Sequence, residues 1–235
     1  MKKYLFDKPL REGFIKSRPN RFVMQVVVNG KIVRCFCPCS TRIGSLKFEN
    51  IPCLLSANKN NGTQYTVEAI SLNPLSAKRR SWIGINQTKI NSYREHFFRN
   101  RQLNRILSKI TSVKREYPLS RTRIDLLVDS TLIEIKTPLT SLSYKNKLSR
   151  DAAFNSYHRT VKHYKVLFNN VGNLKRAIVL HCFMYDANIY KDILSNIKNQ
   201  RMRNIIIRAT NSGVENWQVN LKIDVKGVRL NLKKA

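Results

Sequence analysis

The chain has 235 residues, enough for one large or two small domains around a hydrophobic core, and its 42% hydrophobic content is ordinary for a globular protein. Lysine and arginine number 44 against 14 aspartate and glutamate, a formal net charge of +30. The positive electrostatic field from this charge favours the binding of polyanions, so nucleic acid is the expected partner. An alternative is that part of the charge reflects genome or organelle composition, since asparagine is also abundant.

The sequence contains no run long and apolar enough to span a membrane, and no secretory signal segment follows Met1. The five cysteines do not pair evenly. The simplest interpretation is a soluble protein of a reducing compartment without a membrane partner. This compartment is the cytoplasm or, for an organelle-encoded protein, the plastid stroma.

Residues 1–85 predict a small β domain. Asn29-Gly30, between apolar residues 22–28 and 31–36, is a strong hairpin signal. Further strand-like segments cover residues 52–56, 65–70 and 81–85, and several short strands at this spacing predict a barrel or sandwich. Basic residues of this domain that adjoin an aromatic residue are candidate nucleic-acid contacts, although residues 78–80 are equally typical of a solvated loop. The candidates are Arg21, Arg34, Lys78, Arg79, Arg80 and Trp82.

Three cysteines in the segment Cys35-x-Cys37-Pro-Cys39 have two interpretations, a zinc site and buried free thiols. One residue between thiols does not match the usual spacing of zinc ligands. Buried thiols are therefore favoured, with Cys53 as the only nearby fourth ligand for the zinc alternative.

Residues 91–110 form the clearest predicted helix, with apolar side chains over about half of its circumference. Ser92 and Glu95 have the spacing of a capping box. Arg94, Arg101 and Arg105 fall on another face. Such a stripe is able to follow a phosphate backbone, and a solvated surface is the alternative.

Residues 122–128 and 131–136 predict two strands joined by the turn Asp129-Ser130. This register places Asp125 opposite Glu134, and the period of two puts Lys136 on the same face as Glu134. Like charges directly opposite destabilise a sheet, and a hard cation such as Mg²⁺ or Mn²⁺ bound by Asp125 and Glu134 would offset the repulsion. Lys136 is then placed to orient water or to stabilise charge on a phosphate. The alternative is a surface hairpin whose carboxylates pair with nearby arginines.

The rest of the chain predicts an α/β pattern. An apolar run over residues 176–184 is typical of a strand buried on both faces, as in a parallel sheet. The other predicted elements are an edge strand over 114–117, a loop over 139–153, helices over 152–168 and 189–199, and strands over 204–209, 217–225 and 228–232.

The acidic pair with its lysine resembles the motif of the PD-(D/E)xK nuclease superfamily. Over nearly its whole length the chain is similar to the SfsA, or sugar fermentation stimulation, family, whose motifs occur here in the same order. The matching segments are RTRID at residues 121–125, EIK at 134–136, RTVKH at 159–163 and, near the N-terminus, RF at 21–22 and CP at 37–38 with Gly44.

The resemblance implies an OB-like β-barrel over residues 1–85 and a PD-(D/E)xK nuclease-like α/β domain over residues 86–235. It implies a protein that binds nucleic acid, DNA rather than RNA, and hydrolyses phosphodiester bonds with a metal. Asp125, Glu134 and Lys136 would be the catalytic residues. The residues expected to hold phosphate near them are Arg121, Arg123, Arg159, Lys162 and His163.

Two positions depart from the family pattern. Lys114 stands where relatives often carry an acid, with Glu116 as the nearest acid, and Cys39 stands in place of an asparagine. These departures leave two alternatives open. One is a DNA-binding regulator of the sugar-metabolism type that keeps the nuclease fold and cuts nothing, and the other is an RNA-binding factor that uses the barrel alone.

Overall fold

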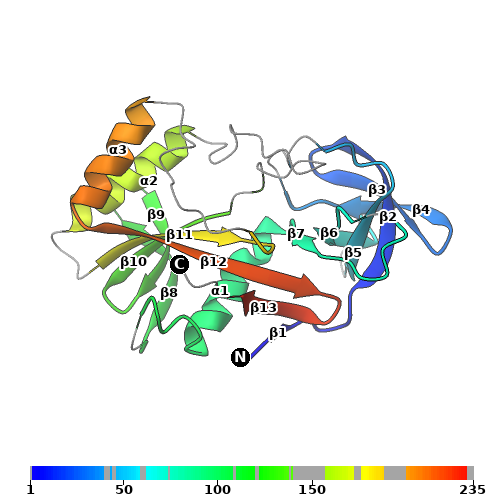
Figure 1. Cartoon of the computed structure of the whole chain (residues 1–235), viewed down its shortest axis with the longest axis horizontal. Coiled ribbons are helices and arrows are strands. Elements are labelled where there is room, and N and C mark those ends of the chain that lie inside the picture. The colour runs from blue at the N-terminus through cyan, green and yellow to red at the C-terminus, as the bar shows by residue number, and fades with distance from the viewer. Residues whose placement is uncertain are drawn as a thin grey trace.

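The structure is a computed structural model, and it describes residues 2–39, 43, 46–58, 62–73, 75–107, 110–119, 122–137, 139, 157–171, 176–187 and 200–231. Within these ranges the chain forms two β-sheets, one closed into a barrel and one covered by helices on both faces (Figure 1). None of the helices in these ranges is long and apolar enough to cross a membrane.

The barrel follows the strand order β4-β3-β2-β5-β6-β7, and parallel pairing of β4 with β6 closes it. Its hairpin between β3 and β4 is confirmed, since Asn29 and Gly30 both take positive φ, as a tight hairpin turn requires. The strand bounds are β2 Arg11–Asn20, β3 Val23–Val28, β4 Lys31–Phe36, β5 Ile51–Ala57, β6 Tyr65–Ile70 and β7 Ile83–Gly84. The long strand β2 is not predicted from the sequence, because charged residues interrupt its apolar positions.

The second sheet has the order β1-β13-β12-β11-β10-β9-β8. Its centre is parallel, because β11 runs in the same direction as both β10 and β12. The strand bounds are β1 Tyr4–Leu5, β8 Val113–Leu119, β9 Thr122–Val128, β10 Thr131–Lys136, β11 Arg176–Phe183, β12 Val214–Asp224 and β13 Gly227–Asn231. The first strand therefore belongs to this sheet, which corrects its assignment to the N-terminal domain.

Helices cover both faces of the second sheet. Helices α2 (Tyr157–Asn170) and α3 (Gln200–Asn211) pack on one face, where Tyr164 and Ile206 meet Leu132. Helix α1 (Ile90–Arg99) packs on the other face (Figure 1), where Phe97 meets residues of β10 and β11. The strands between them are buried on both sides, as the apolar run of β11 predicts.

Two helical segments differ from prediction. Helix α1 ends at Arg99 rather than at residue 110, because the chain turns at Arg101 with a φ of 55°. It begins at Ile90, directly after the 3-10 turn η1 (Gln87–Lys89) that Asn86 caps, so the predicted capping box is wrong. The predicted strand over 204–209 is also wrong, since α3 occupies it. Its buried residues recur at the helical spacing of Met202, Ile206 and Ala209, which the β-branched run 205–207 obscures.

The hairpin of β9 and β10 has the predicted bounds, and its pairs follow the predicted register from Thr131–Val128 to Ile133–Leu126. The registered pairs end before the predicted pair of Asp125 and Glu134. The loop predicted over 139–153 lies outside the described residues except for Leu139. The first part of the helix predicted over 152–168 and the whole of that over 189–199 lie outside them as well.

The barrel and the second sheet are joined through their backbones. Gly84 N–H donates to the Met184 carbonyl at 2.8 Å, Leu10 N–H donates to the Val225 carbonyl at 2.7 Å, and Trp82 forms an isolated bridge with Ile223. These contacts connect both ends of the barrel segment to the larger sheet.

A buried carboxylate reinforces this junction. Glu68 of β6 is fully buried, and its carboxylate accepts from Ser56 Oγ at 2.6 Å, from Lys89 Nζ at 2.7 Å and from Asn86 Nδ2 at 2.8 Å. Both oxygens are therefore satisfied. The network ties the barrel to the turn that leads into α1.

Candidate functional site

The acidic pair lies on β9 and β10, beneath α2. Along β10 the side chains alternate, so that Ile133 and Ile135 enter the core on the α1 side while Glu134 and Lys136 lie on the α2 side. His163 of α2 reaches the same place from above the sheet, where its Nδ1 contacts the Glu134 carboxylate. Secondary structure thus fixes three of the predicted residues in one cluster.

The two carboxylate oxygens of Glu134 lie in different environments. Its Oε1 accepts from Lys136 Nζ at 2.6 Å and also contacts His163 Nδ1. Its Oε2 is buried and has no hydrogen-bond partner among the described residues. Burial raises the pKa of Glu134, but His163 and Lys136 outweigh burial and hold that pKa below its usual value. The carboxylate is therefore ionised, with one oxygen left over for a ligand.

The position of the proton on His163 decides how this cluster bonds. Its Nδ1 lies 3.2 Å from Lys136 Nζ as well as against Glu134 Oε1. An ammonium only donates, so Nδ1 accepts from Lys136 in one tautomer and donates to Glu134 in the other. Only the ring with a proton on Nδ1 therefore holds the Glu134 carboxylate directly, and the other tautomer acts through Lys136.

Asp125 sits where the strand ladder is interrupted. Between β9 and β8, the paired residues pass from Arg115–Leu126 directly to Tyr117–Ile124, so Asp125 is skipped. Between β9 and β10, the last paired residues are Ile133 and Leu126. In place of a ladder bond, Asp125 Oδ2 accepts the N–H of Ile135 at 2.8 Å.

The side chains of β9 also change sides of the sheet at Asp125, against the regular alternation of a strand. Ile124 packs with the α2 and α3 side, whereas Leu126, two residues later, packs with the α1 side. The neighbouring Glu116 of β8 has a φ of 49°, a rare conformation for a residue other than glycine. The distortion sets the Asp125 carboxylate apart from the regular pleat.

The two carboxylates influence each other. Burial raises the pKa of Asp125, and the charge of Glu134 raises it further, while Arg94 and Lys136 oppose these effects. The expected repulsion between the acidic side chains is therefore present. A cation bound between them would remove it.

The donor set suits a hard divalent cation. Oxygen ligands are available from Asp125 and from the unpartnered Oε2 of Glu134, and hard cations prefer oxygen. No group of three or more His, Cys, Asp or Glu around one point occurs in the described part of the chain. A cation here would take its other ligands from water and phosphate, as Mg²⁺ commonly does.

Sequence reasoning missed the polar residues that extend this cluster along the sheet. His181 of β11 lies beside Lys136 in parallel register, and burial lowers its pKa to about 4. Its Nε2 is 3.4 Å from Asn216 Oδ1, which also accepts from the Tyr164 hydroxyl at 2.8 Å. The only available signal was a single histidine inside an otherwise apolar strand.

Most of the predicted nucleic-acid contacts lie on the surface of the described structure. Those that are exposed are Arg21, Arg34, Lys78, Arg79, Arg101, Arg105, Arg123 and Lys162. Arg80 is engaged instead, in an ion pair with Glu12 at 3.1 Å, and Trp82 packs against the core beside the second sheet. Arg121 and the side chain of Arg159 lie outside the description, and His163 is buried against Glu134.

Arg94 departs from prediction. Only 2% of it is exposed, so it cannot belong to a solvent-facing stripe with Arg101 and Arg105. Those two residues follow the end of α1 and do not continue its faces. Arg94 instead donates to Asn91 Oδ1 at 3.1 Å and lies within electrostatic reach of Asp125.

The outward face of β2, β3 and β4 carries exposed apolar side chains next to cations. Alternation along β4 exposes Ile32, Arg34 and Phe36. Phe36 pairs with Val23, beside the exposed Phe22, whose ring lies 4.7 Å from the Arg21 guanidinium. Phe22 and Phe36 were not singled out from the sequence, although a period of two in the hairpin would have placed Phe36 outward.

All five cysteines are buried, and none of them forms a disulfide. Burial raises the pKa of Cys35 to about 11 and raises that of Cys53 further. The Cys35 and Cys53 thiols are therefore protonated at neutral pH, and all five cysteines belong to the hydrophobic cores.

Comparison with known proteins gives one consistent result. A family model described as the SfsA N-terminal OB domain matches residues 17–85. Sugar fermentation stimulation protein homologs match from Aquifex aeolicus, with 31% identity over 130 residues and 55% of each chain, and from Methanobrevibacter smithii, with 25% identity over 229 residues and 93% of each chain. The homolog from Desulfotalea psychrophila is 31% identical over 56% of each chain, so the chain spans about half the length of two of these relatives.

A solved structure has the same fold. Pyrococcus furiosus SfsA in complex with Ca²⁺ superposes with a TM-score of 0.75 over 98% of this chain and 97% of that chain, at 17% identity. The predicted combination of an OB-like barrel and an α/β domain is confirmed by this match and by the barrel topology.

Proposed function

Since the chain belongs to the SfsA family, we propose that it binds nucleic acid, with DNA as the preferred partner, and hydrolyses phosphodiester bonds with a divalent cation. The observation that carries this proposal is the pair Asp125 and Glu134, which repel each other beside Lys136 while Glu134 Oε2 stays buried and unpartnered. Such an arrangement is unfavourable for stability and favourable for binding a cation.

Each residue of the cluster has a role in that chemistry. Asp125 and Glu134 would hold Mg²⁺ or Mn²⁺, which supplies Lewis acidity and lowers the pKa of water. Lys136 places its Nζ beside the carboxylates, where it would stabilise negative charge that develops on the phosphate. His163 orients the Glu134 carboxylate. The solved Pyrococcus SfsA is a complex with Ca²⁺, which supports a divalent cation in this family.

The barrel would supply most of the affinity. In OB-folds the face of the second and third strands binds oligonucleotides, and here those strands are β3 and β4. Phe22 and Phe36 offer rings for stacking, and Arg21 and Arg34 offer charges for the backbone.

The test is cleavage of labelled single- and double-stranded DNA with Mg²⁺, with Mn²⁺ and with EDTA. Wild-type protein is expected to cut only with the cation. Glu134→Gln should abolish cutting and leave binding measurable, whereas the surface variant Glu49→Gln should retain both. Equal loss of cutting and binding in Glu134→Gln would contradict this division between the two domains.

A DNA-binding regulator without nuclease activity is the second candidate. It is favoured by Lys114, which occupies the position of a family acid, and by the two groups that already occupy Glu134 Oε1. Binding that is insensitive to EDTA, without cleavage under any cation, would select it. Competition between RNA and DNA at a fixed salt concentration tests the choice of nucleic acid.

A further inference from the structure

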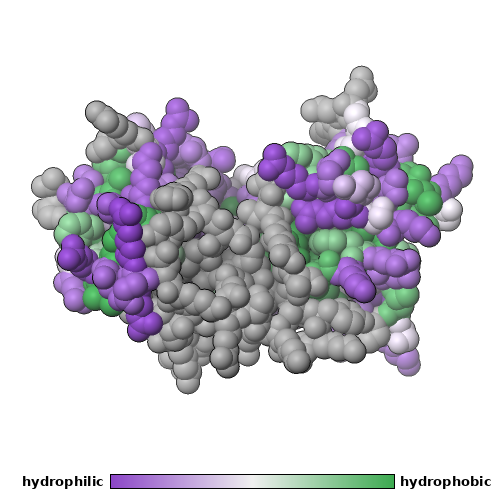
Figure 2. Space-filling view, turned by 90° about the horizontal axis from the view of Figure 1, so that it is seen from above, coloured by the Kyte–Doolittle hydropathy of each residue, from purple (hydrophilic) through white to green (hydrophobic). Residues whose placement is uncertain are grey.

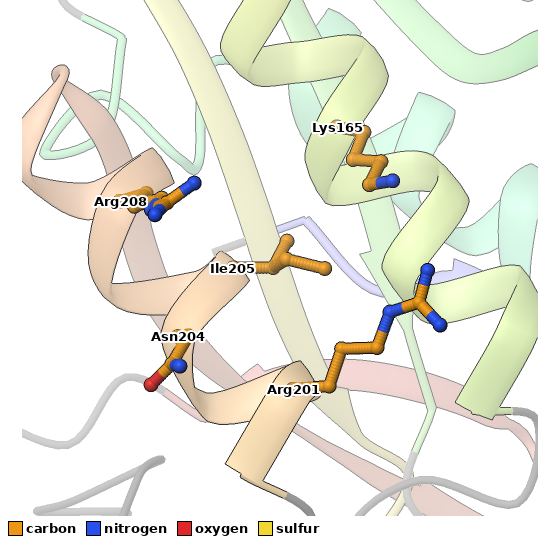
Figure 3. A pocket seen from close by; sticks show the side chains of 5 residues that line it. All are labelled: Lys165, Arg201, Asn204, Ile205 and Arg208. Carbon is orange, nitrogen blue, oxygen red and sulfur yellow. The ribbon is translucent and has the colours of Figure 1, made fainter.

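A groove of about 440 Å³ lies between α2 and α3. Its lining consists of Lys165 from α2 and Arg201, Asn204, Ile205 and Arg208 from α3. Figure 3 shows Arg201 and Ile205 extending from α3 towards α2, which carries Lys165. The lining thus contains three cations and no carboxylate.

The groove follows from the amphipathic pattern of α3. Met202, Ile206 and Ala209 are buried towards the sheet. Arg201, Ile205 and Arg208 recur at a spacing of three to four residues and so share another face, with the two arginines about 10 Å apart along the axis. In Figure 2 hydrophilic side chains gather on the lobe at the left, where α2 and α3 lie.

The three cations are not used by the described part of the fold. Lys165, Arg201 and Arg208 are exposed, and none of their side chains makes an ion pair or hydrogen bond with residues that the structure describes. Like charges held along one groove repel each other, which costs stability. An anionic ligand would offset that cost, and arginine is especially suited to phosphate because its guanidinium binds two oxygens at once.

We propose that this groove is a second phosphate-binding site, which takes the phosphodiester backbone of a nucleic acid. The inference extends the proposed function, on which it rests. Successive phosphates of one duplex strand are spaced by about 3.4 Å along the helix axis, so cations spread over about 10 Å span about three of them. Ile205 provides an apolar wall between the charges, which suits a sugar more than a free ion.

The groove and the acidic cluster lie on opposite sides of one helix. His163 and Lys165 are two residues apart, which places them about 200° apart around α2, and a helix with its side chains is about 10 Å thick. A nucleic-acid strand bound in the groove therefore contacts it through phosphates other than those that reach Glu134. The groove holds the nucleic acid and does not contribute to the reaction.

The test compares the salt dependence of binding for two triple variants with equal charge. The groove variant carries Lys165→Gln, Arg201→Gln and Arg208→Gln. Its slope of log affinity for single-stranded DNA against log salt concentration should become less steep by about 2, since each phosphate contact contributes about 0.7 to the slope. The control Lys8→Gln, Lys222→Gln, Lys226→Gln removes exposed cations on other elements and should keep the wild-type slope. Circular dichroism confirms that both are folded.

The outcomes separate this inference from the proposed function. Glu134→Gln should keep the wild-type salt slope, and the groove variant should still cut a dinucleotide substrate. An unchanged slope in the groove variant, or an equal change in both triple variants, would overturn the inference while leaving cleavage intact. Binding of pyrophosphate at the groove without any binding of nucleic acid would also overturn it, in favour of a small phosphorylated ligand, and would remove the proposed function as well.

Discussion

His163 on α2 and Glu134 on β10 meet at the same carboxylate oxygen that receives the Lys136 ammonium at 2.6 Å. The contact joins a helix to the central sheet through a single buried group. It anchors Oε1 firmly and leaves Oε2 for a ligand.

His163→Ala should shift the acidic limit of cation binding to higher pH. His163 is one of the groups that hold the pKa of Glu134 below its usual value, so its loss raises that pKa and protonates the carboxylate at a higher pH. Titration calorimetry with Mn²⁺ across a range of pH measures the limit. The control is Asn169→Ala on the exposed side of the same helix, and matching profiles for both variants would argue against the role of His163.

Asp125→Asn should stabilise the cation-free protein and abolish its response to cations. Burial and the charge of Glu134 raise the pKa of Asp125, so its ionisation costs more in the folded protein than in the unfolded chain, whereas an amide still accepts the Ile135 N–H. In EDTA the variant should melt at a higher temperature than the wild type. A bound cation stabilises by about 2.7 kcal/mol at a hundredfold excess over its Kd, so adding Mn²⁺ should raise the wild-type Tm alone. A Tm that responds equally in both proteins would refute the assigned ligand.

Glu68→Ala should destabilise the protein by about 2–4 kcal/mol, because it leaves Lys89, Asn86 and Ser56 without their acceptor. Urea unfolding measures the change. Lys89→Met is the comparison, and it should cost less, since Glu68 keeps two of its donors and Lys89 is already 38% exposed. A loss below about 0.5 kcal/mol in Glu68→Ala would show that the network is not structural.

The fold should lose stability at mildly acidic pH through His181. Burial lowers its pKa to about 4, from 6.5 for the free side chain. Between these values the unfolded chain binds a proton that the folded protein does not, so stability falls as the pH drops through this window. The expected loss near pH 5 relative to neutral pH is about 2 kcal/mol from this group. His181→Gln should reduce the loss, and an identical pH dependence in both proteins would contradict the assignment.

The hairpin that carries the acidic pair was predictable because both strands are rich in Ile, Leu and Val and a short turn fixes their register. Other features depend on information that is remote in the sequence. The contact between His163 and Glu134 joins residues 29 positions apart, and only the family resemblance placed them together. The end of α1 was missed because no glycine or proline marks it, since Arg101 itself adopts the left-handed conformation.

Local sequence was misleading where tertiary packing decides the outcome. The run Ile205–Ile206–Ile207 favours a strand by propensity, yet only Ile206 of the three is fully buried, as a helix face requires. Arg94 was placed on the surface by its charge, whereas the structure buries it beside Asn91 and within reach of Asp125. Neither outcome follows from the order of residues without knowledge of what packs against them.

The backbone links at Gly84 and Leu10, together with the Trp82–Ile223 bridge, hold the barrel and the larger sheet in one fixed orientation. A strand gripped on the outer surface of the barrel would then reach Asp125 and Glu134 after a constant number of nucleotides. Under the proposed function, each cut would therefore fall at a fixed distance from the segment that the barrel holds, whatever the base sequence.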